Sequence, residues 1–217
     1  MMTPFIRNHQ YNLITKQLEL LQHARSTVSD QKVVQSVQYS AEAKIIEAFE
    51  HLTDEQQHRL GGLSALQKAE HFQAYAHALE PYLIPFPQVT EKQIKKLFHK
   101  NKKLTVPDVN AIDYARTTYM GWQDIATGKM FLVYQQNEDV VGIEGKFTPT
   151  NKKSTCFICH KQREAALFTA VSKAKPANAS PDYYKAVGNY MCLHSEECNR
   201  SITDVAALER FVRAVTG

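Results

Sequence analysis

The sequence predicts an α+β protein of two domains: a helical N-terminal domain, expected over residues 1–82, and a C-terminal α/β domain, expected over residues 83–217. Three observations lead to this fold class. Apolar residues recur at helical spacing through the first 80 residues, and a proline-rich segment then interrupts that pattern. After Pro107, segments rich in β-branched and aromatic residues appear, which favours strands. A chain of 217 residues has room for one or two domains with a substantial core.

The N-terminal region is expected to contain at least four helices. Thr53 with Gln56, and Ser64 with Gln67, have capping-box spacing, so each pair is expected to open a helix. The prolines of the segment PYLIPFPQVT, residues 81–90, lack a backbone donor and restrict the residues before them, which predicts a linker between the domains. The apolar positions at helical spacing are Ile14, Leu18, Leu21, Val28, Val34, Val37, Ala41, Ile45, Phe49 and Leu52.

The C-terminal region begins with another capping box, Thr90 and Gln93, which predicts a helix through EKQIKKLFHKNKK, ending at Lys103. KMFLVYQ and VVGIEGKFT are joined by the turn-like NED and predict a hairpin. EAALFTAVSK and YYKAVGNYMC predict a second pair of strands around the loop AKPANASPD, residues 174–182. One helix is expected at the end of the chain, with an apolar stripe of Val205, Leu208, Val212 and Val215.

The charge of the chain is unevenly distributed. Residues 1–90 carry seven Lys and Arg against nine Asp and Glu, whereas residues 91–217 carry nineteen against thirteen. This asymmetry suggests two modules, the second of which has acidic partners. Its lysine-rich helix is either a solvated face or a surface that attracts an acidic protein or RNA. The lysines concerned are Lys92, Lys95, Lys96, Lys100, Lys102 and Lys103.

The segment CFICH contains Cys156 and Cys159 and is compatible with three kinds of site: c-type haem attachment, a dithiol redox pair, or half of a zinc site. Haem attachment and a redox pair would both leave Cys192 and Cys198 without a role. Zinc accounts for all four cysteines, and four thiolates leave no open coordination position, so the site is expected to hold one structural zinc. In CLHSEEC, the gap between the two cysteines is wider than usual, which makes His194 a possible substitute ligand. Cys198 is preferred because a thiolate binds zinc more strongly. His160 and His194 are expected to lie beside the site or simply to be exposed.

Several classes of function are disfavoured by the sequence. No apolar run approaches the ~20 residues that span a bilayer, and the polar N-terminus lacks a signal-peptide core, so a cytoplasmic protein without a membrane partner is expected. Neither a phosphate-binding glycine loop nor a nucleophile elbow is present, and no catalytic constellation emerges. A non-enzymatic binding protein is therefore expected. The alternative from another class is a zinc-finger protein that binds RNA or the ribosome through the lysine helix and exposed aromatics.

Several long stretches run in order along the whole chain: HQYNLI, PYLIPFP, KQIKKLFHKNKKLTVP, GWQDIA followed by KMFLVY, CFICHKQREAALF and YMCLHSEECNR. Together they resemble the FusB-type fusidic acid resistance proteins, which bind bacterial elongation factor G. The resemblance implies a helical N-terminal domain and a C-terminal domain built on a treble-clef-like zinc site. It also implies target protection, in which the protein binds the factor and promotes its release from drug-stalled ribosomes.

The same resemblance implies the site residues. Cys156, Cys159, Cys192 and Cys198 are the expected zinc ligands. Aromatic and basic side chains near the metal are expected to contact elongation factor G. The protein is expected to be a monomer and to act on the ribosome only indirectly. The partner-binding residues expected on this basis, together with those of the lysine helix, are Tyr190, Phe211, Phe157, Lys185, Lys95, Lys96, Lys100, Lys102 and Lys103.

Overall fold

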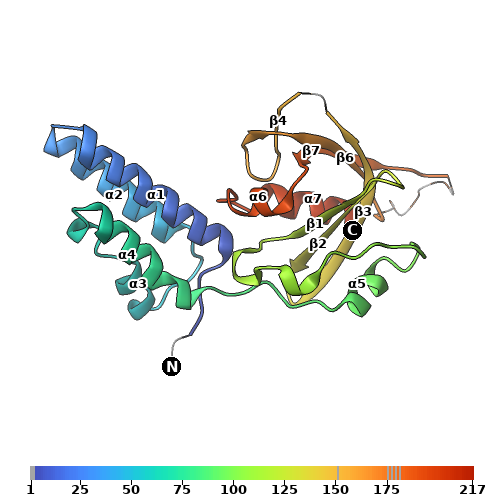
Figure 1. Cartoon of the computed structure of the whole chain (residues 1–217), viewed down its shortest axis with the longest axis horizontal. Helices are drawn as coiled ribbons and strands as arrows, with labels where there is room; N and C mark the ends of the chain where they lie inside the picture. Colours follow the sequence, from blue (N-terminus) through green and yellow to red (C-terminus); the bar gives the residue numbers. More distant parts are fainter. Residues whose placement is uncertain (1–2, 151, 175, 177, 179, 181) are drawn as a thin grey trace. The chain divides into compact units, whose positions relative to one another are not determined.

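The computed structural model describes residues 3–150, 152–174, 176, 178, 180 and 182–217. The chain divides into two compact units, Met1–Ile84 and Pro85–Gly217 (Figure 1). Of the loop expected over residues 174–182, residues 175, 177, 179 and 181 lie outside the described part. Within the described residues, no helix combines the length and the apolar character that crossing a membrane requires.

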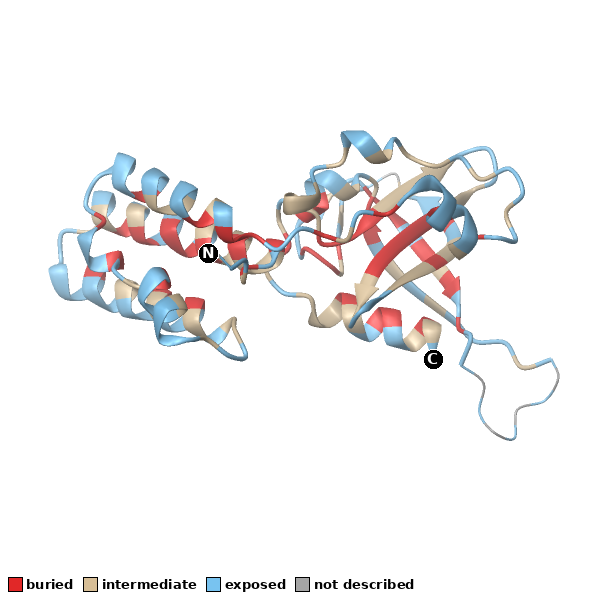
Figure 2. Ribbon diagram, turned by 90° about the horizontal axis from the view of Figure 1, so that it is seen from below, coloured by how far each residue is buried: buried red, intermediate tan, exposed pale blue. Residues whose placement is uncertain are grey.

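The first unit is helical, as predicted. Helix α1 packs against both α2 and α4, and Ile14, Leu21 and Ile45 are fully buried (Figure 2). The helical period predicted through Phe49 and Leu52 runs too far, because α2 ends at Glu47 and both residues follow it, only partly buried. A parallel bridge between Ile6 and Leu83 ties the start of the unit to its end. The helices are α1 (Asn8–Thr27), α2 (Gln31–Glu47), α3 (Asp54–Leu60), α4 (Ala69–Leu79) and the 3-10 turns η1 (Leu63–Ala65) and η2 (Glu80–Tyr82).

One of the two capping boxes predicted for this unit is confirmed and the other is wrong. Thr53 caps α3 together with Gln56. Ser64, however, lies inside the 3-10 turn η1, and α4 begins only at Ala69. The reason is local: Gly62 has a left-handed φ of 81°, which turns the chain so that Leu63 is buried, and the Gln67 side chain donates to the Ser64 carbonyl instead of capping a helix.

The second unit is built on a five-stranded antiparallel sheet in the order β1-β2-β3-β6-β7, with a separate two-stranded β4-β5 pair. Both predicted strand pairs, β2 with β3 and β6 with β7, are confirmed. The strands are β1 (Met120–Asp124), β2 (Lys129–Gln136), β3 (Asp139–Pro149), β4 (Ser154–Thr155), β5 (Gln162–Arg163), β6 (Ala165–Val171) and β7 (Ala186–Cys192). The helices are α5 (Glu91–Leu97), η3 (Val109–Ala111), η4 (Tyr114–Arg116), α6 (Ser195–Asn199) and α7 (Ala206–Thr216).

Two features of this unit depart from the predictions. The lysine-rich helix is shorter than expected, because α5 ends at Leu97 and Phe98 leaves the helical conformation to enter the core. Strand β1 and helix α6 were not predicted, since both are only five residues long. The capping box of Thr90 and Gln93 and the apolar stripe of α7 are confirmed.

The sheet has a core on each face. On one face, Phe168 and Met130 pack with α7 and with the four cysteines. On the other face, Phe131 and Val133 of β2 pack with Ile94 and Phe98 of the α5 region. Among the described residues, the second layer covers β1, β2 and part of β3, and no element packs on the same face of β6 and β7.

Candidate functional site

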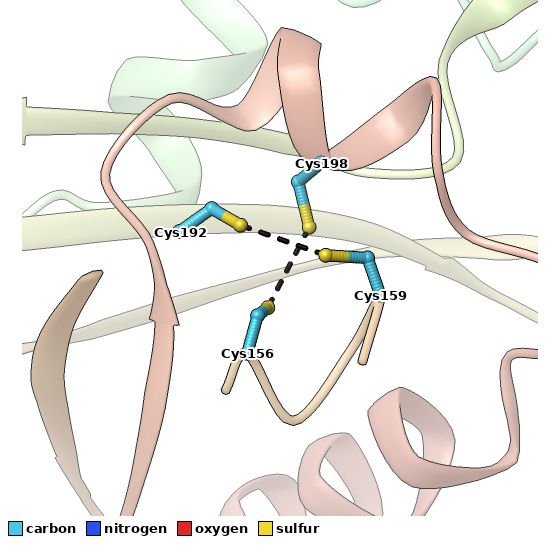
Figure 3. Close-up of side chains that lie close together, drawn as sticks. All are labelled: Cys156, Cys159, Cys192 and Cys198. Atoms are coloured by element: carbon cyan, nitrogen blue, oxygen red, sulfur yellow. Dashed lines mark hydrogen bonds between the residues drawn. The ribbon is translucent and has the colours of Figure 1, made fainter. Parts of the chain in front are cut away.

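The four cysteines converge from two separate segments. Cys156 and Cys159 flank the turn between β4 and β5, Cys192 ends β7, and Cys198 lies in α6 (Figure 3). All four are buried, and their Sγ atoms lie within 4.8 Å of one another. The Sγ atoms of Cys156 and Cys198 are 3.8 Å apart, and those of Cys159 and Cys192 are 3.6 Å apart.

The first pair is positioned by a tight turn. The Cys156 N–H donates to the Lys161 carbonyl, and the His160 N–H donates to the Cys156 carbonyl at 2.9 Å. His160 adopts a left-handed φ of 55°, which closes the turn within so few residues. The Phe157 N–H donates to the Tyr190 carbonyl at 2.8 Å, so this turn is attached to β7.

The second pair depends on the short helix α6. The Cys198 N–H donates to the His194 carbonyl, which places Cys198 one helical turn beyond His194 and brings its sulfur back to the end of β7. Of the five residues between Cys192 and Cys198, the first two lead into α6 and the other three form its first turn. His160 and His194 are both exposed and are not part of the sulfur cluster.

The donor set fits a zinc ion. Four sulfurs at about 2.3 Å from a tetrahedral centre would be separated by about 3.8 Å, close to the two distances observed. Such close packing prevents independent ionisation. The pKa of the Cys156 thiol is lowered by hydrogen bonds from Cys159, Cys192 and Cys198, whereas that of the Cys198 thiol is raised by its hydrogen bonds to Cys156, Cys159 and Cys192. A divalent cation would allow all four thiolates to form together.

A second feature is an uncovered strip of the sheet beside this cluster. We call it the open β6–β7 face. It consists of Leu167, Thr169 and Val171 of β6 and of Ala186, Gly188 and Tyr190 of β7, which pair across the two strands. Leu167, Val171 and Tyr190 are 37%, 50% and 46% exposed, high values for large apolar side chains on a sheet. Tyr184, just before β7, is 69% exposed.

The segment from Lys92 to Lys103, called the lysine segment below, contacts the strands next to this open face. Asn101, in the turn after α5, contacts Lys129 and Glu144 on the same face of the sheet. Two residues beyond Glu144, Lys146 is exposed and pairs with Thr169 of the open β6–β7 face. The predicted partner-binding lysines are all exposed; they are Lys95, Lys96, Lys100, Lys102, Lys103 and Lys185.

The predicted aromatic contact residues lie in different environments. Tyr190 is on the open face, and Phe157 is half-buried in the turn between the first two cysteines. Phe211 is 3% exposed, with its ring centroid 5.3 Å from that of Phe157 and 5.7 Å from that of Phe168. The open face was not recognised from the sequence, because β6 is apolar at almost every position, as in a strand that is covered on both faces.

The two units define a class of protein: a helical N-terminal domain joined to an α/β domain with a four-cysteine treble-clef zinc finger. Residues 94–213 match the family described as FBP C-terminal treble-clef zinc-finger. Residues 5–87 match the family described as elongation factor G-binding protein, N-terminal. The chain belongs to the family of elongation factor G-binding proteins.

A solved structure supports the fold over the whole chain. The structure of the fusidic acid resistance protein FusC is similar with a TM-score of 0.77 and 22% sequence identity, covering 100% of this chain and 99% of FusC. A comparison with curated proteins finds no match. The fold class predicted from the sequence, including the treble-clef-like site, is thus confirmed.

Proposed function

We propose that this protein binds elongation factor G and promotes its release from ribosomes stalled by fusidic acid, acting in the cytoplasm as a non-enzymatic protection factor. The family to which the chain belongs and the whole-chain similarity to a fusidic acid resistance protein both support this proposal. Binding energy, rather than bond making or breaking, would carry the function. A binder can shift a stalled complex only by favouring one state of its target over another.

The observation that carries the proposal is the open β6–β7 face beside the lysine segment. An apolar strip with an exposed tyrosine and a basic border has the character of an interface with an acidic surface: an aromatic anchor, apolar contact area and charges that steer association. A soluble protein gains nothing from leaving Leu167, Val171 and Tyr190 in water together unless a partner covers them.

The zinc site would support this surface without taking part in chemistry. The turn that carries Cys156 and Cys159 donates a hydrogen bond to the Tyr190 carbonyl, and Cys192 lies two residues after Tyr190. Four protein ligands leave no open position, so the metal would be structural. Holding β7 rigid before binding would reduce the entropy lost on association.

Titration calorimetry of the full chain with purified, RNA-free elongation factor G tests the proposal. We expect saturable binding with one protein per factor. A parallel titration with ribosomal RNA distinguishes the proposal from the alternative that the zinc finger binds RNA. Binding to RNA without binding to the factor would contradict the proposal. Pull-down from bacterial lysate with and without nuclease provides the matching check, because a factor that is retained after nuclease treatment is not bridged by RNA.

A further inference from the structure

The zinc site does not by itself explain the environment of Tyr119. It lies just before β1 and is completely buried in the core that contains the four cysteines. Its hydroxyl is buried and has no hydrogen-bond partner among the described residues. Buried polar groups are almost always paired, so an unpaired hydroxyl in this position needs an explanation.

Tyr119 shares its core with the four cysteines, and Cys198, Cys156 and Cys192 act on its hydroxyl electrostatically. Burial raises the pKa of Tyr119 well above its usual range, and Cys198 adds to the increase, followed by Cys156 and Cys192. A tyrosine hydroxyl is protonated at neutral pH and can act as a donor. A neutral thiol is a weak acceptor, whereas a thiolate is a strong one, because hydrogen bonds to charged groups are shorter and stronger.

The backbone around Tyr119 is fixed to the segment that carries the second pair of cysteines. The Asn199 side chain, adjacent to Cys198, accepts from the N–H groups of Thr118 and Tyr119 at 2.9 and 3.2 Å and donates to the Tyr119 carbonyl at 2.8 Å. The Ser195 hydroxyl donates to the Gly121 carbonyl at 2.8 Å. These bonds hold the start of β1 against α6.

Gly121 shows how closely the ring is enclosed. A Cβ atom added at this position would lie 2.9 Å from the Tyr119 ring and 3.2 Å from the Ser195 Cβ. A side chain here would push the ring or α6 away from its place. The Tyr119 ring therefore packs closely over Gly121, next to Ser195 of α6.

We propose that the Tyr119 hydroxyl donates a hydrogen bond to the Cys198 thiolate when the four cysteines hold a metal ion, and that Asn199 positions it to do so. The inference rests on the zinc site of the proposed function. Four thiolates around a divalent cation leave a net charge of about −2 in a buried site, and each donor to sulfur disperses part of it. Tyr119 is a positioning residue of the metal centre and not a ligand.

Tyr119→Phe in the full chain is the test, because it removes the hydroxyl and keeps the ring. Zinc affinity is measured by competition with a chromophoric chelator. We expect zinc to bind roughly 10-fold more weakly, the lower end of the range for losing a partner of a metal ligand. Tyr114→Phe is the matched control, since it removes a hydroxyl that donates to the Val109 carbonyl in the other core of the same unit.

Two further readouts separate this role from simple packing. In the zinc-loaded protein, the rate at which an excess of chelator removes zinc should rise in Tyr119→Phe and stay unchanged in Tyr114→Phe, because only the first variant removes a donor to a ligand sulfur. In the cobalt-substituted protein, the sulfur-to-metal charge-transfer bands should move to longer wavelength, because losing a donor raises the energy of the sulfur electrons. Tyr114→Phe should leave these bands unchanged.

Zinc affinity within twofold of wild type in a folded Tyr119→Phe variant, with unshifted cobalt bands, would overturn the inference. If this variant does not fold, the wild-type protein loaded with ¹¹³Cd decides instead. A slowly exchanging tyrosine hydroxyl proton coupled to cadmium supports the hydrogen bond, and its absence contradicts it. A wild-type chain that binds no zinc at all would contradict the zinc site itself, which is a different failure.

Discussion

Tyr190 lies where the end of β7 that carries Cys192 meets the open β6–β7 face. Its side chain is 46% exposed, while its carbonyl accepts the hydrogen bond from Phe157 in the cysteine turn. We predict that Tyr190→Ala weakens elongation factor G binding by roughly 1–3 kcal/mol, because a rigid aromatic on an apolar strip has the character of a hot spot. Calorimetry measures the affinity, and thermal unfolding should show little change in melting temperature.

Tyr39→Ala is the matched control for this prediction, since Tyr39 is 66% exposed but lies on α2 in the other unit. It should leave binding unchanged. Unaltered affinity in a folded Tyr190→Ala variant would remove Tyr190 from the interface.

Phe211 differs from Tyr190 because it is buried between Phe157 and Phe168. We predict that Phe211→Ala lowers the free energy of unfolding by about 3–5 kcal/mol, through lost apolar burial and the cavity left behind. Chemical denaturation measures this loss. Any weakening of factor binding should arise because Phe157 is displaced, and not because Phe211 itself contacts the factor. Weaker binding with an unchanged free energy of unfolding would contradict the packing described.

At the level of single elements, the lysine segment offers a direct test of electrostatic steering. We predict that reversing Lys100 and Lys102 to Glu slows association with elongation factor G and reduces its salt dependence, because both side chains are exposed and flank Asn101, which contacts Glu144 of β3. Stopped-flow measurements at several salt concentrations provide both quantities. Lys16→Glu with Lys32→Glu makes the same change in net charge on exposed positions of the helical unit and should have much less effect. If the two pairs of substitutions change the association rate equally, the lysine segment is only a solvated face.

The zinc finger is the second element with its own prediction. Apparent zinc-binding energies of about 10–16 kcal/mol in small fingers match the stability of an entire domain. We predict one zinc per chain, and we expect Cys156→Ser to unfold the sheet of the second unit while α1 to α4 stay helical. Elemental analysis gives the metal content, and circular dichroism at helical and near-ultraviolet wavelengths follows the two units. A folded sheet in the zinc-free variant would contradict the structural role of the metal.

Sequence patterns predicted elements well where local chemistry decides their structure. The apolar period of α1 and α2, the capping box at Thr53 and the hairpin of β2 and β3 all follow from near neighbours. The helix start predicted at Ser64 was wrong although the capping signal is the same, because Gly62 is left-handed and Leu63 is buried. The four cysteines were recognisable because metal ligation requires those residue types at related spacings.

The open β6–β7 face could not be predicted for a different reason. Leu167 and Val171 alternate with buried residues as they would in any strand between two layers. Only the order of the sheet and the limited reach of α5 leave them uncovered. In the same way, the burial of Phe211 and the unpaired hydroxyl of Tyr119 arise from contacts between residues distant in sequence.

At the scale of the whole molecule, the central claim is that binding alone accelerates release of a stalled factor. Each tenfold preference for the free factor over the ribosome-bound factor corresponds to about 1.4 kcal/mol, so a modest difference in affinity is sufficient. The drug should be recovered chemically intact, and the isolated protein should not hydrolyse GTP.

The dissociation rate of labelled elongation factor G from fusidic acid-stalled ribosomes tests this claim most directly. We predict that the rate rises with protein concentration and then saturates, and that Tyr190→Ala shifts the rise to higher concentration while Tyr39→Ala does not. A dissociation rate that stays constant while the wild-type protein demonstrably binds the factor would contradict the account.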